Sequence, residues 1–492
     1  MTPRELVEGL LAILPADAVL HRPEQLLVYD CDAYTIEKSA PLAVVLPRST
    51  EEVASVMRFA HAHGLAVAPR GAGTGLSGGC LAETGGIMVG LSRMTRIVSV
   101  DVPNRRAVVE AGVVNQKLSE AVAAHGLTFA PDPSSQIACT IGGNVAENSG
   151  GPHTLKYGVT ANHVLGVEVV LPDGEVVWLG GEVEDLPGLD LLGLMIGSEG
   201  TFGIVTQACV KLVPRAQAVR TLLAVFPTVD DASAAVSALI AAGIIPAALE
   251  MMDQLILQAV EAAFGFGFPL DAGAVLLIEL DGLEAGLDDA KDEVARLCVA
   301  NRAREVRVAA DDAERARLWL ARKKAVGAVG RLAPSKVTMD GVIPRTRLPE
   351  VLRAIAEIAE RHQLRIANVF HAGDGNLHPV TLFDERDPEQ VERVLKAGGE
   401  ILMACLAAGG SITGEHGVGV EKAAYMHEMF SEADMALGYG SVQILGSTNF
   451  TLSGHGITVP TTWINGGTFS LSIGSQSDKG DTNTALATCP PT

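Results

Sequence analysis

The sequence predicts an α+β protein of more than one domain. At 492 residues the chain is too long for one ordinary core. The composition is 48% hydrophobic and only 4% aromatic, with 53 glycines, which indicates a core of Ala, Val and Leu and many tight loops. The pattern changes after Pro214: short strands and long glycine-rich segments precede it, and helices alternate with strands beyond it. We therefore expect an N-terminal helical segment (1–37), two domains (38–217 and 218–437) and an atypical tail (438–492).

The first domain is predicted to be rich in short strands. A capping-box pattern runs from Ser49 to Glu52, so a helix is expected from there to about His63. Apolar runs flank Asp173 and Gly174, a turn sequence typical of a β-hairpin. The expected strands lie at 42–47, 65–69, 86–91, 105–112, 166–180 (the hairpin) and 202–214.

The second domain is predicted to be a sheet with helices on one face. Helical patterns occur at 230–243, 287–300, 348–362 and 387–409, and strand patterns at 221–227, 274–280 and 365–370. The tail is different, because it has only three charged residues, much Gly, Ser and Thr, and no helical periodicity. It fits a flexible or β-rich extension, or a foreign or frame-shifted segment.

Charge and cysteine usage narrow the function classes. The formal net charge of −21 argues against nucleic acid and against an anionic bilayer as partners, so an anionic substrate would need a metal or an arginine. The seven scattered cysteines form no C-x-x-C motif, which indicates neither an iron–sulfur cluster nor structural zinc. The N-terminus lacks a signal-peptide layout and no apolar run is long enough to span a membrane, so a cytoplasmic protein is expected.

Two histidines and a Glu-His pair form a candidate metal site. His371 and His378 lie seven residues apart, and Glu415 and His416 follow within a glycine-rich stretch. Two imidazoles and a carboxylate would leave a divalent metal, zinc, manganese or iron, with open positions for a substrate, and His416 could act as a base. The structural alternative is two loop histidines and a surface Glu-His pair.

Three glycine-rich loops predict an extended cofactor. The first, 69–79, could direct successive N–H groups at a pyrophosphate. It contains a G-x-G-x-x-G pattern, but more glycine and a strand follow instead of a helix, so a Rossmann site is not indicated. A simple turn is the alternative for this loop. Similar small-residue loops at 131–158 and 197–205 favour a large flat ligand.

At these motifs the chain resembles the FAD-binding family of vanillyl-alcohol oxidase and p-cresol methylhydroxylase (PCMH). Within it, the chain is most similar to FAD-linked subunits of bacterial glycolate oxidases, with D-lactate and D-2-hydroxyglutarate dehydrogenases as cousins. The motifs are PRGAGTGLSGG, APDPSSQIACTIGGNVAENSGG, LKYG, GSEGTFGIVT, ARKKAVGAVGR, HAGDGNLHP and GEHGVG, spread over about 5–437. The resemblance implies a PCMH-type FAD-binding domain of two α+β subdomains, then an α+β FAD-linked oxidase C-terminal (cap) domain.

The resemblance also implies which residues bind FAD. The first loop would hold the pyrophosphate, the second would lie along the flavin and the third near the adenosine. The first loop has no His or Cys for a covalent link, so non-covalent FAD is expected. The implied FAD-binding residues are Arg70, Gly71, Ala72, Gly73, Thr74, Gly75, Leu76, Ser77, Pro131, Asp132, Ser134, Ser135, Gly142, Gly143, Asn144, Ser149, Gly150, Glu199, Gly200, Gly203 and Ile204.

In the cap domain the resemblance implies a substrate site. His371, His378 and Glu415 would hold the divalent metal, and His416 would be the base. Arg322 would grip the substrate carboxylate, with Lys336 and Asn376 as further substrate contacts; a basic helix surface is the alternative for Arg322. The family's closing helix and Asn-Pro-Gly-Lys motif are replaced here by the tail, which puts the packing of the C-terminus in question.

The implied activity is oxidation of a small 2-hydroxy acid, glycolate first, to the 2-oxo acid by proton abstraction and hydride transfer to flavin. D-lactate or D-2-hydroxyglutarate is the alternative substrate. A flavin-binding subunit without chemistry, or an NAD-dependent dehydrogenase, are alternatives of another kind. Electrons would pass to a quinone or to companion subunits, one flavin-type and one iron–sulfur, which could bring the protein to the inner membrane surface.

Overall fold

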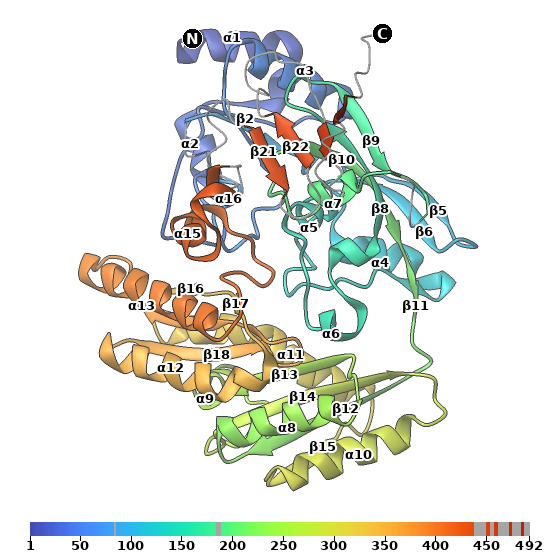
Figure 1. Cartoon of the computed structure of the whole chain (residues 1–492), viewed down its shortest axis with the longest axis vertical. Helices are drawn as coiled ribbons and strands as arrows, with labels where there is room; N and C mark the ends of the chain where they lie inside the picture. Colours follow the sequence, from blue (N-terminus) through green and yellow to red (C-terminus); the bar gives the residue numbers. More distant parts are fainter. Residues whose placement is uncertain are drawn as a thin grey trace.

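The computed structural model describes residues 1–82, 85–183 and 188–436, and the backbone of four short strands in the tail. Figure 1 shows two bodies, one above the other. The upper body contains the N-terminal elements, and the chain leaves it at β11 (Val213–Pro214) to enter β12 (Ala218–Phe226) of the lower body. After α13 (Pro388–Ala407) the chain returns, and α15 (Met426–Met429) and α16 (Glu432–Ala436) lie near the upper body.

The first subdomain of the upper body is a four-stranded sheet covered by helices. Its order is β1-β2-β4-β3, antiparallel between β1 and β2 and parallel elsewhere. Leucines of the first helix and apolar residues of the third pack on it. The elements are α1 (Pro3–Ile13), β1 (Val19–Leu20), α2 (Pro23–Leu26), β2 (Ala43–Val45), α3 (Thr50–Ala62), β3 (Val67–Arg70) and β4 (Ile87–Gly90).

The predicted start of α3 is confirmed, with one difference. Ser49 is the N-cap, and its hydroxyl accepts from the N–H of Glu52. The Glu52 carboxylate accepts from the N–H of Arg48 instead of Ser49, so the capping box is not closed. The helix ends at Ala62, one residue before the predicted end.

The second subdomain is an antiparallel five-stranded sheet. Its order is β5-β6-β10-β8-β9, and β8 and β9 form the predicted hairpin. Apolar residues of α4 and α5 pack against one face of this sheet. The elements are β5 (Ile97–Asp101), β6 (Arg106–Glu110), α4 (Asn115–Val122), β7 (Leu127–Thr128), α5 (Ile141–Glu147), α6 (Thr154–Tyr157), β8 (Val164–Val170), β9 (Val176–Gly180), α7 (Leu191–Met195) and β10 (Ile204–Lys211).

The lower body is the cap domain, a sheet of nine strands in the described part of the chain. The path is β15-β12-β14-β13-β18-β19-β17, with β20 paired to β18 and β16 to β20. The strands beyond β12 are β13 (Ala248–Asp253), β14 (Ala274–Gly282), β15 (Glu305–Val308), β16 (Ser335–Thr338), β17 (Gly341–Val342), β18 (Arg365–His371), β19 (Asn376–Leu377) and β20 (Pro379–Phe383).

Helices cover both faces of this sheet, so the prediction of helices on one face is wrong. Leu222 and Ala224 of β12 face the core with α8, α10, α12 and α13, whereas Leu223 and Val225 face a second core with α9 and α11. Continuous apolar runs, which the strand sequences contain, are typical of strands buried on both faces. The helices are α8 (Val229–Ala241), α9 (Gln254–Phe264), α10 (Leu287–Ala300), α11 (Asp312–Ala328) and α12 (Leu348–Arg361).

Among the cap elements that were not predicted, β13, α9 and α11 form part of the central sheet or its second helical layer, and two of these position the site. In α11 the apolar residues are mixed with many charges and lack a clean period. Asp253 and Asp311 cap α9 and α11 by accepting from the N–H groups of Ile256 and Glu314. The register then pairs Glu250 of β13 with His371 of β18.

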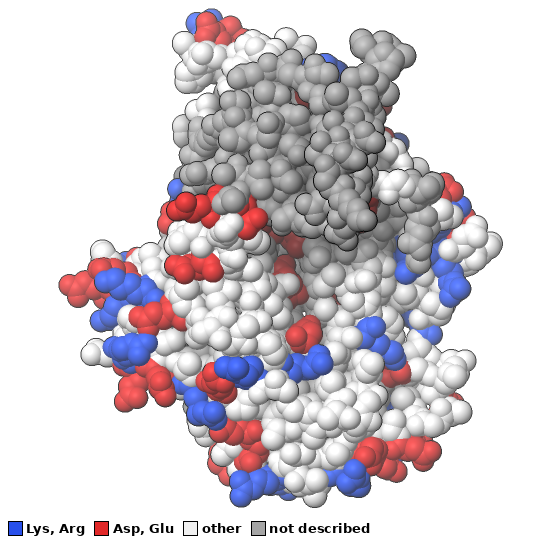
Figure 2. All heavy atoms as spheres, viewed as in Figure 1, with Lys and Arg blue, Asp and Glu red and all other residues white. Residues whose placement is uncertain are grey.

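The tail contains an antiparallel sheet, in line with the β-rich alternative. It consists of β21 (Asn449–Leu452), β22 (Ile457–Pro460), β23 (Ser472–Gly474) and β24 (Thr484–Leu486). None of the helices in the described part of the chain combines the length and apolar character needed to cross a bilayer. Figure 2 shows acidic and basic side chains interspersed over the cap domain on the face in view.

Candidate active site

The predicted metal ligands come together at the edge of the cap sheet. His371 is the last residue of β18, and a tight turn leads to β19 and His378. Glu415 and His416 lie in the loop between α13 and α14 (Gly419–Lys422). We call residues 414–419 the base loop, and His371, His378 and Glu415 the ligand cluster.

The distances fit a three-ligand metal site. Glu415 Oε1 lies 3.2 Å from His371 Nε2 and 3.4 Å from His378 Nε2. One ligand atom from each residue lies within 4.8 Å of the others. His378 Nε2 is buried and has no hydrogen-bond partner among the described residues, a costly state that a metal would relieve. The donor set therefore fits a divalent cation, and the interpretation as surface residues is wrong.

Glu250 orients His371. Its Oε1 lies 2.7 Å from His371 Nδ1, which leaves Nε2 directed at Glu415, and Arg322 Nη2 lies 2.6 Å from its Oε2. Carboxylates commonly fix metal-binding imidazoles in this way. Burial opposes the charge on His371, but Glu250 and then Glu415 outweigh it and raise the pKa of His371 well above its usual range. No sequence motif marks Glu250, so it was not predicted.

Arg322 is buried in α11, whereas Lys323 and Lys324 are exposed, so the interpretation of Arg322 as a helix-surface residue is wrong. Its Nη2 is paired with Glu250, which in turn contacts His371 of the ligand cluster. Its Nε has no hydrogen-bond partner in the described structure. The guanidinium thus lies beside the site, and substrate binding by it stays a prediction.

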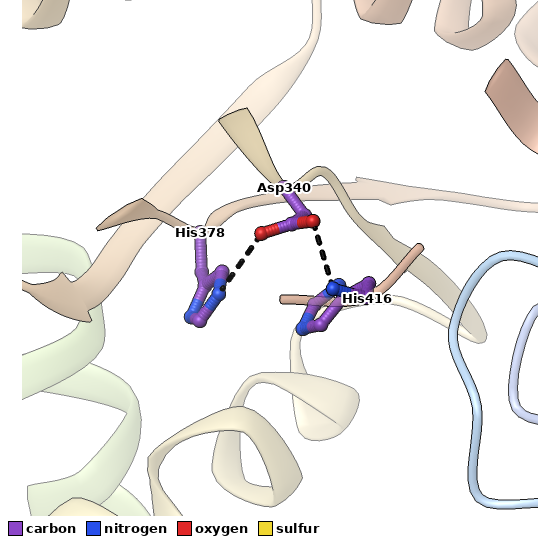
Figure 3. A group of neighbouring side chains, drawn as sticks. All are labelled: Asp340, His378 and His416. Carbon is purple, nitrogen blue, oxygen red and sulfur yellow. Dashed lines mark hydrogen bonds and ion pairs between the residues drawn. The ribbon is translucent and has the colours of Figure 1, made fainter. Parts of the chain in front are cut away.

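Asp340, which was not predicted, is the central anion of the site. It lies between β16 and β17 and is fully buried. Figure 3 shows it between His378 and His416; its Oδ1 is 3.6 Å from His378 Nε2, and its Oδ2 accepts from the His416 N–H. Burial opposes its charge, but Lys422, His416 and His378 lower the pKa of Asp340 well below its usual range.

His416 stacks on His378 and faces the ligand cluster. The ring centroids are 4.8 Å apart at 12°, and His416 Nε2 lies 4.0 Å from Glu415 Oε1. Burial, reinforced by His378 and Lys422, lowers the pKa of His416 to about 4, although Asp340 and Glu415 act in the other direction. The imidazole is therefore neutral near pH 7 and able to accept a proton.

The structure brings one of the two remaining substrate candidates to the site. Asn376 pairs with His371 across the β18–β19 turn, and its buried Oδ1 has no partner among the described residues. Lys336 is on β16 opposite Leu382 of β20, and its ammonium lies near Gly330. Substrate binding by either residue stays a prediction.

The three glycine-rich loops lie close to one another. A Cβ on Gly71 would lie 2.6 Å from Thr140 Oγ1, so the first loop touches the start of α5. A Cβ on Gly200 would lie 2.3 Å from Pro69, which brings the third loop against β3. The close approach of three segments made of small residues fits a cradle for a large ligand.

The predicted FAD residues fall in or next to these loops. Arg70 ends β3, and Gly71, Ala72, Gly73, Thr74, Gly75, Leu76 and Ser77 follow it. Pro131, Asp132, Ser134 and Ser135 precede α5, Gly142, Gly143 and Asn144 are inside it, and Ser149 and Gly150 follow it. Glu199, Gly200 and Gly203 lie between α7 and β10, and Ile204 begins β10.

Several of these side chains are bound by other protein groups. The Arg70 guanidinium donates to the Cys31 carbonyl at 2.9 Å, and Asn144 Oδ1 accepts from Asn115 at 3.0 Å. Asp132 Oδ2 lies 2.9 Å from His153 Nδ1. These residues shape the loops, and their contact with FAD stays a prediction.

The second loop also reaches the ligand cluster. A Cβ on Gly150 would lie 2.8 Å from Glu415 Oε2 and 2.6 Å from Thr154 Oγ1, so there is no room for a larger residue. Gly150 of the first domain and Glu415, a predicted metal ligand of the cap, are thus in van der Waals contact.

Two family models match the chain. "FAD binding domain" matches residues 41–180 and "FAD linked oxidases, C-terminal domain" matches residues 215–438. Among solved structures, p-cresol methylhydroxylase with substrate bound has a TM-score of 0.74 at 18% identity, covering 86% of this chain and 91% of that one. At that identity the likeness concerns the fold alone.

Curated relatives are much more similar in sequence. Glycolate oxidase subunit GlcD of Escherichia coli (strain K12) is 47% identical over 435 residues, 88% of this chain and 86% of that protein. The protein of the same name from Bacillus subtilis is 42% identical, covering 81% and 85%. D-lactate dehydrogenase of Archaeoglobus fulgidus is 33% identical, covering 82% and 90%.

Proposed function

Because the chain belongs to the family of FAD-linked oxidases, we propose that it binds FAD non-covalently and oxidises a small 2-hydroxy acid, glycolate first, to the 2-oxo acid. The observation that carries this proposal is the contact of Gly150 with Glu415. It joins a predicted flavin loop to a metal-ligand set. Oxidation of an α-hydroxyl needs a hydride acceptor for the C–H and a proton acceptor for the O–H, and a metal on the hydroxyl oxygen assists the proton loss.

When bound, FAD supplies the acceptor for a hydride, and a divalent cation held by His371, His378 and Glu415 supplies a Lewis acid for the hydroxyl oxygen. His416 then accepts the hydroxyl proton at Nε2, the nitrogen that faces Glu415. The imidazole of His416 stacks on His378, and the backbone N–H of His416 donates to Asp340, so the ring and its backbone are both held beside the cluster.

Arg322 orients the substrate in this proposal. Its guanidinium is held by Glu250 and keeps a free Nε–H, so it can donate to a carboxylate beside the ligand cluster. A substrate fixed at its carboxylate and hydroxyl has one C–H directed at the flavin loops. Asn376 offers an additional polar group, and Lys336 is a weaker candidate because its ammonium points to Gly330.

The arrangement favours an enzyme over a flavin-binding subunit without chemistry. A non-catalytic subunit has no need for the buried ligand cluster, the neutral base and the anions Glu250 and Asp340 that orient them. We propose that electrons pass to companion subunits, one flavin-type and one iron–sulfur, or to a quinone. Two relatives are named as subunits of a glycolate oxidase. Cytoplasmic location, with attachment to the inner membrane through companions, is part of the same proposal.

Anaerobic titration tests the proposal. The purified protein should be yellow, and glycolate should bleach the flavin absorbance while producing one equivalent of glyoxylate per flavin. Parallel titrations with D-lactate and D-2-hydroxyglutarate rank the three acids as substrates. The ranking has to be measured, because one methyl group changes the discrimination between substrates by only about 1–3 kcal/mol. A yellow protein that none of the three acids bleaches would contradict the proposal, and a colourless protein without flavin would favour the NAD-dependent alternative.

A further inference from the structure

The base loop is held from two sides, by one carboxylate of each domain. It carries the third residue of the ligand cluster and the proposed base within six residues. It is also the segment in which the chain returns from the cap toward the first domain (Figure 1). The conformation of the base loop therefore depends on contacts with both domains.

On the cap side the anchor is Asp340. Its Oδ2 accepts from the N–H groups of Gly414 at 2.9 Å and His416 at 3.0 Å, and both oxygens lie 3.3 Å from the Glu415 nitrogen. Lys422 Nζ, fully buried, donates to the same carboxylate at 3.0 Å. These bonds fix the first half of the loop.

On the side of the first domain the anchor is Glu199. Its Oε1 accepts from the Val418 N–H and its Oε2 from the Gly419 N–H, each at 2.8 Å. The hydroxyl of Ser77, in the first glycine-rich loop, donates to the His416 carbonyl at 2.9 Å. The second half of the loop is thus held by two residues of the predicted cofactor loops.

Gly417 shows how closely the loop passes over this anchor. Its φ is +84°, and a Cβ there would lie 2.4 Å from Glu147 Oε2 and 3.0 Å from the Glu199 carboxylate. A side chain would push the loop away from both carboxylates. The Glu199 backbone is itself fixed, because its N–H donates to the Ala146 carbonyl at the end of α5 at 2.8 Å.

We infer that Glu199 is a positioning residue for the metal centre, with Ser77 as its helper, and that its carboxylate serves the base loop instead of FAD. Each oxygen holds one N–H of the loop that carries Glu415 and His416. Since Glu199 and Ser77 belong to cofactor loops, metal binding and FAD binding are then linked, and each strengthens the other by the same factor. The inference rests on the proposed function, because it assumes the metal at the ligand cluster.

The test measures Mn²⁺ affinity by calorimetry in the FAD-loaded protein. Loss of residues that orient metal ligands typically costs 10–100-fold in affinity, so Glu199→Ala should weaken Mn²⁺ binding by about that factor. Glu199→Gln keeps one acceptor and should lie between wild type and Glu199→Ala, and Ser77→Ala should have a smaller effect. FAD affinity measured without Mn²⁺, followed by flavin fluorescence, should change much less. Glu175→Gln, at an exposed residue of the β8–β9 turn, is the matched control.

A second arm tests the linkage. Removing FAD from wild type should weaken Mn²⁺ binding, and in Glu199→Ala that dependence should shrink. Equal Mn²⁺ affinity in folded Glu199→Gln, Glu199→Ala and wild type would overturn this inference and leave the proposed function intact. A large loss of FAD affinity with unchanged Mn²⁺ affinity would do so too and assign Glu199 to the cofactor. If wild type bound no Mn²⁺, the proposed metal centre would fall, and this inference with it.

Discussion

Two of the junctions between the domains are built differently. At the first, Ser77 and Glu199 bind backbone groups of the base loop. At the second, side chains pair with side chains: His153 lies 3.5 Å from Glu279, and Lys156 and Tyr157, from the LKYG motif, both bond to Asp281. Glu279 also accepts from Thr221, Arg315 and Trp319, which anchor it in the cap.

The difference indicates a division of labour. Backbone groups cannot change rotamer, so carboxylates that bind them fix the course of a loop, which suits a loop carrying a metal ligand and a base. A side-chain pair with a partly exposed member, such as Lys156 with Asp281, adds little to stability and tolerates substitution. We therefore expect changes around the base loop to affect chemistry strongly, and changes at the second junction to affect stability modestly.

The largest effect is expected for His378→Ala. Removing one of three ligands should abolish stoichiometric metal binding and reduce glycolate oxidation to background, because the Lewis acid is worth several kcal/mol. Metal analysis and turnover with flavin content as reference check this. His125→Ala, an exposed histidine of the first domain, serves as the control. Full turnover without bound metal would refute the metal's role.

His416→Ala should come next. Loss of a general base costs about 10²–10⁴-fold in turnover, while metal and FAD stay bound because His416 is not in the ligand cluster. Rapid-reaction kinetics of flavin reduction would measure the step directly. A variant that reduces its flavin at the wild-type rate would remove His416 from the mechanism.

Arg322→Lys should mainly raise KM for the 2-hydroxy acid. A lysine keeps the charge but not the planar fork, and the loss of charge-assisted hydrogen bonds worth about 1.5–3 kcal/mol corresponds to about 10–150-fold. Steady-state kinetics separates KM from kcat. An unchanged KM would mean that Arg322 only orients Glu250.

These site residues could be predicted to very different extents. His371, His378, Glu415 and His416 stand in glycine-framed motifs, because a tight turn and a ligand must be adjacent in the chain. Glu250 comes from β13 and Asp340 from the turn between β16 and β17, and a lone carboxylate in an apolar run carries no signal before the strand register is known. The second layer of cap helices, α9 and α11, was also missed. That layer follows from strands buried on both faces, which is evident only once the sheet is known.

The second junction should respond to pH through His153. Burial opposes its charge, but Asp132 and then Glu279 outweigh it and raise the pKa of His153 to about 10, above its ordinary 6.5. A raised pKa stabilises the fold fully below about pH 6.5, and that contribution is lost as pH rises toward about 10. Denaturant unfolding across this range should show a decline in wild type that is absent in His153→Gln. Parallel declines in both proteins would disprove the assignment.

The smallest effect is expected for Lys156→Ala. Its ion pair with Asp281 is partly exposed, so the free energy of unfolding should fall by no more than about 1 kcal/mol, with turnover unchanged. Lys117→Ala, which removes an exposed pair with Glu120, is the control. A marked loss of turnover in Lys156→Ala alone would show that the two junctions are not separate in function.

The most direct test is the anomalous diffraction of Mn²⁺ in crystals of the FAD-loaded protein. We expect one strong peak bounded by His371, His378 and Glu415, with the flavin ring beside Gly150 on the open side of the metal. A peak at any other group of side chains, or a flavin ring remote from the ligand cluster, would contradict the proposed reaction.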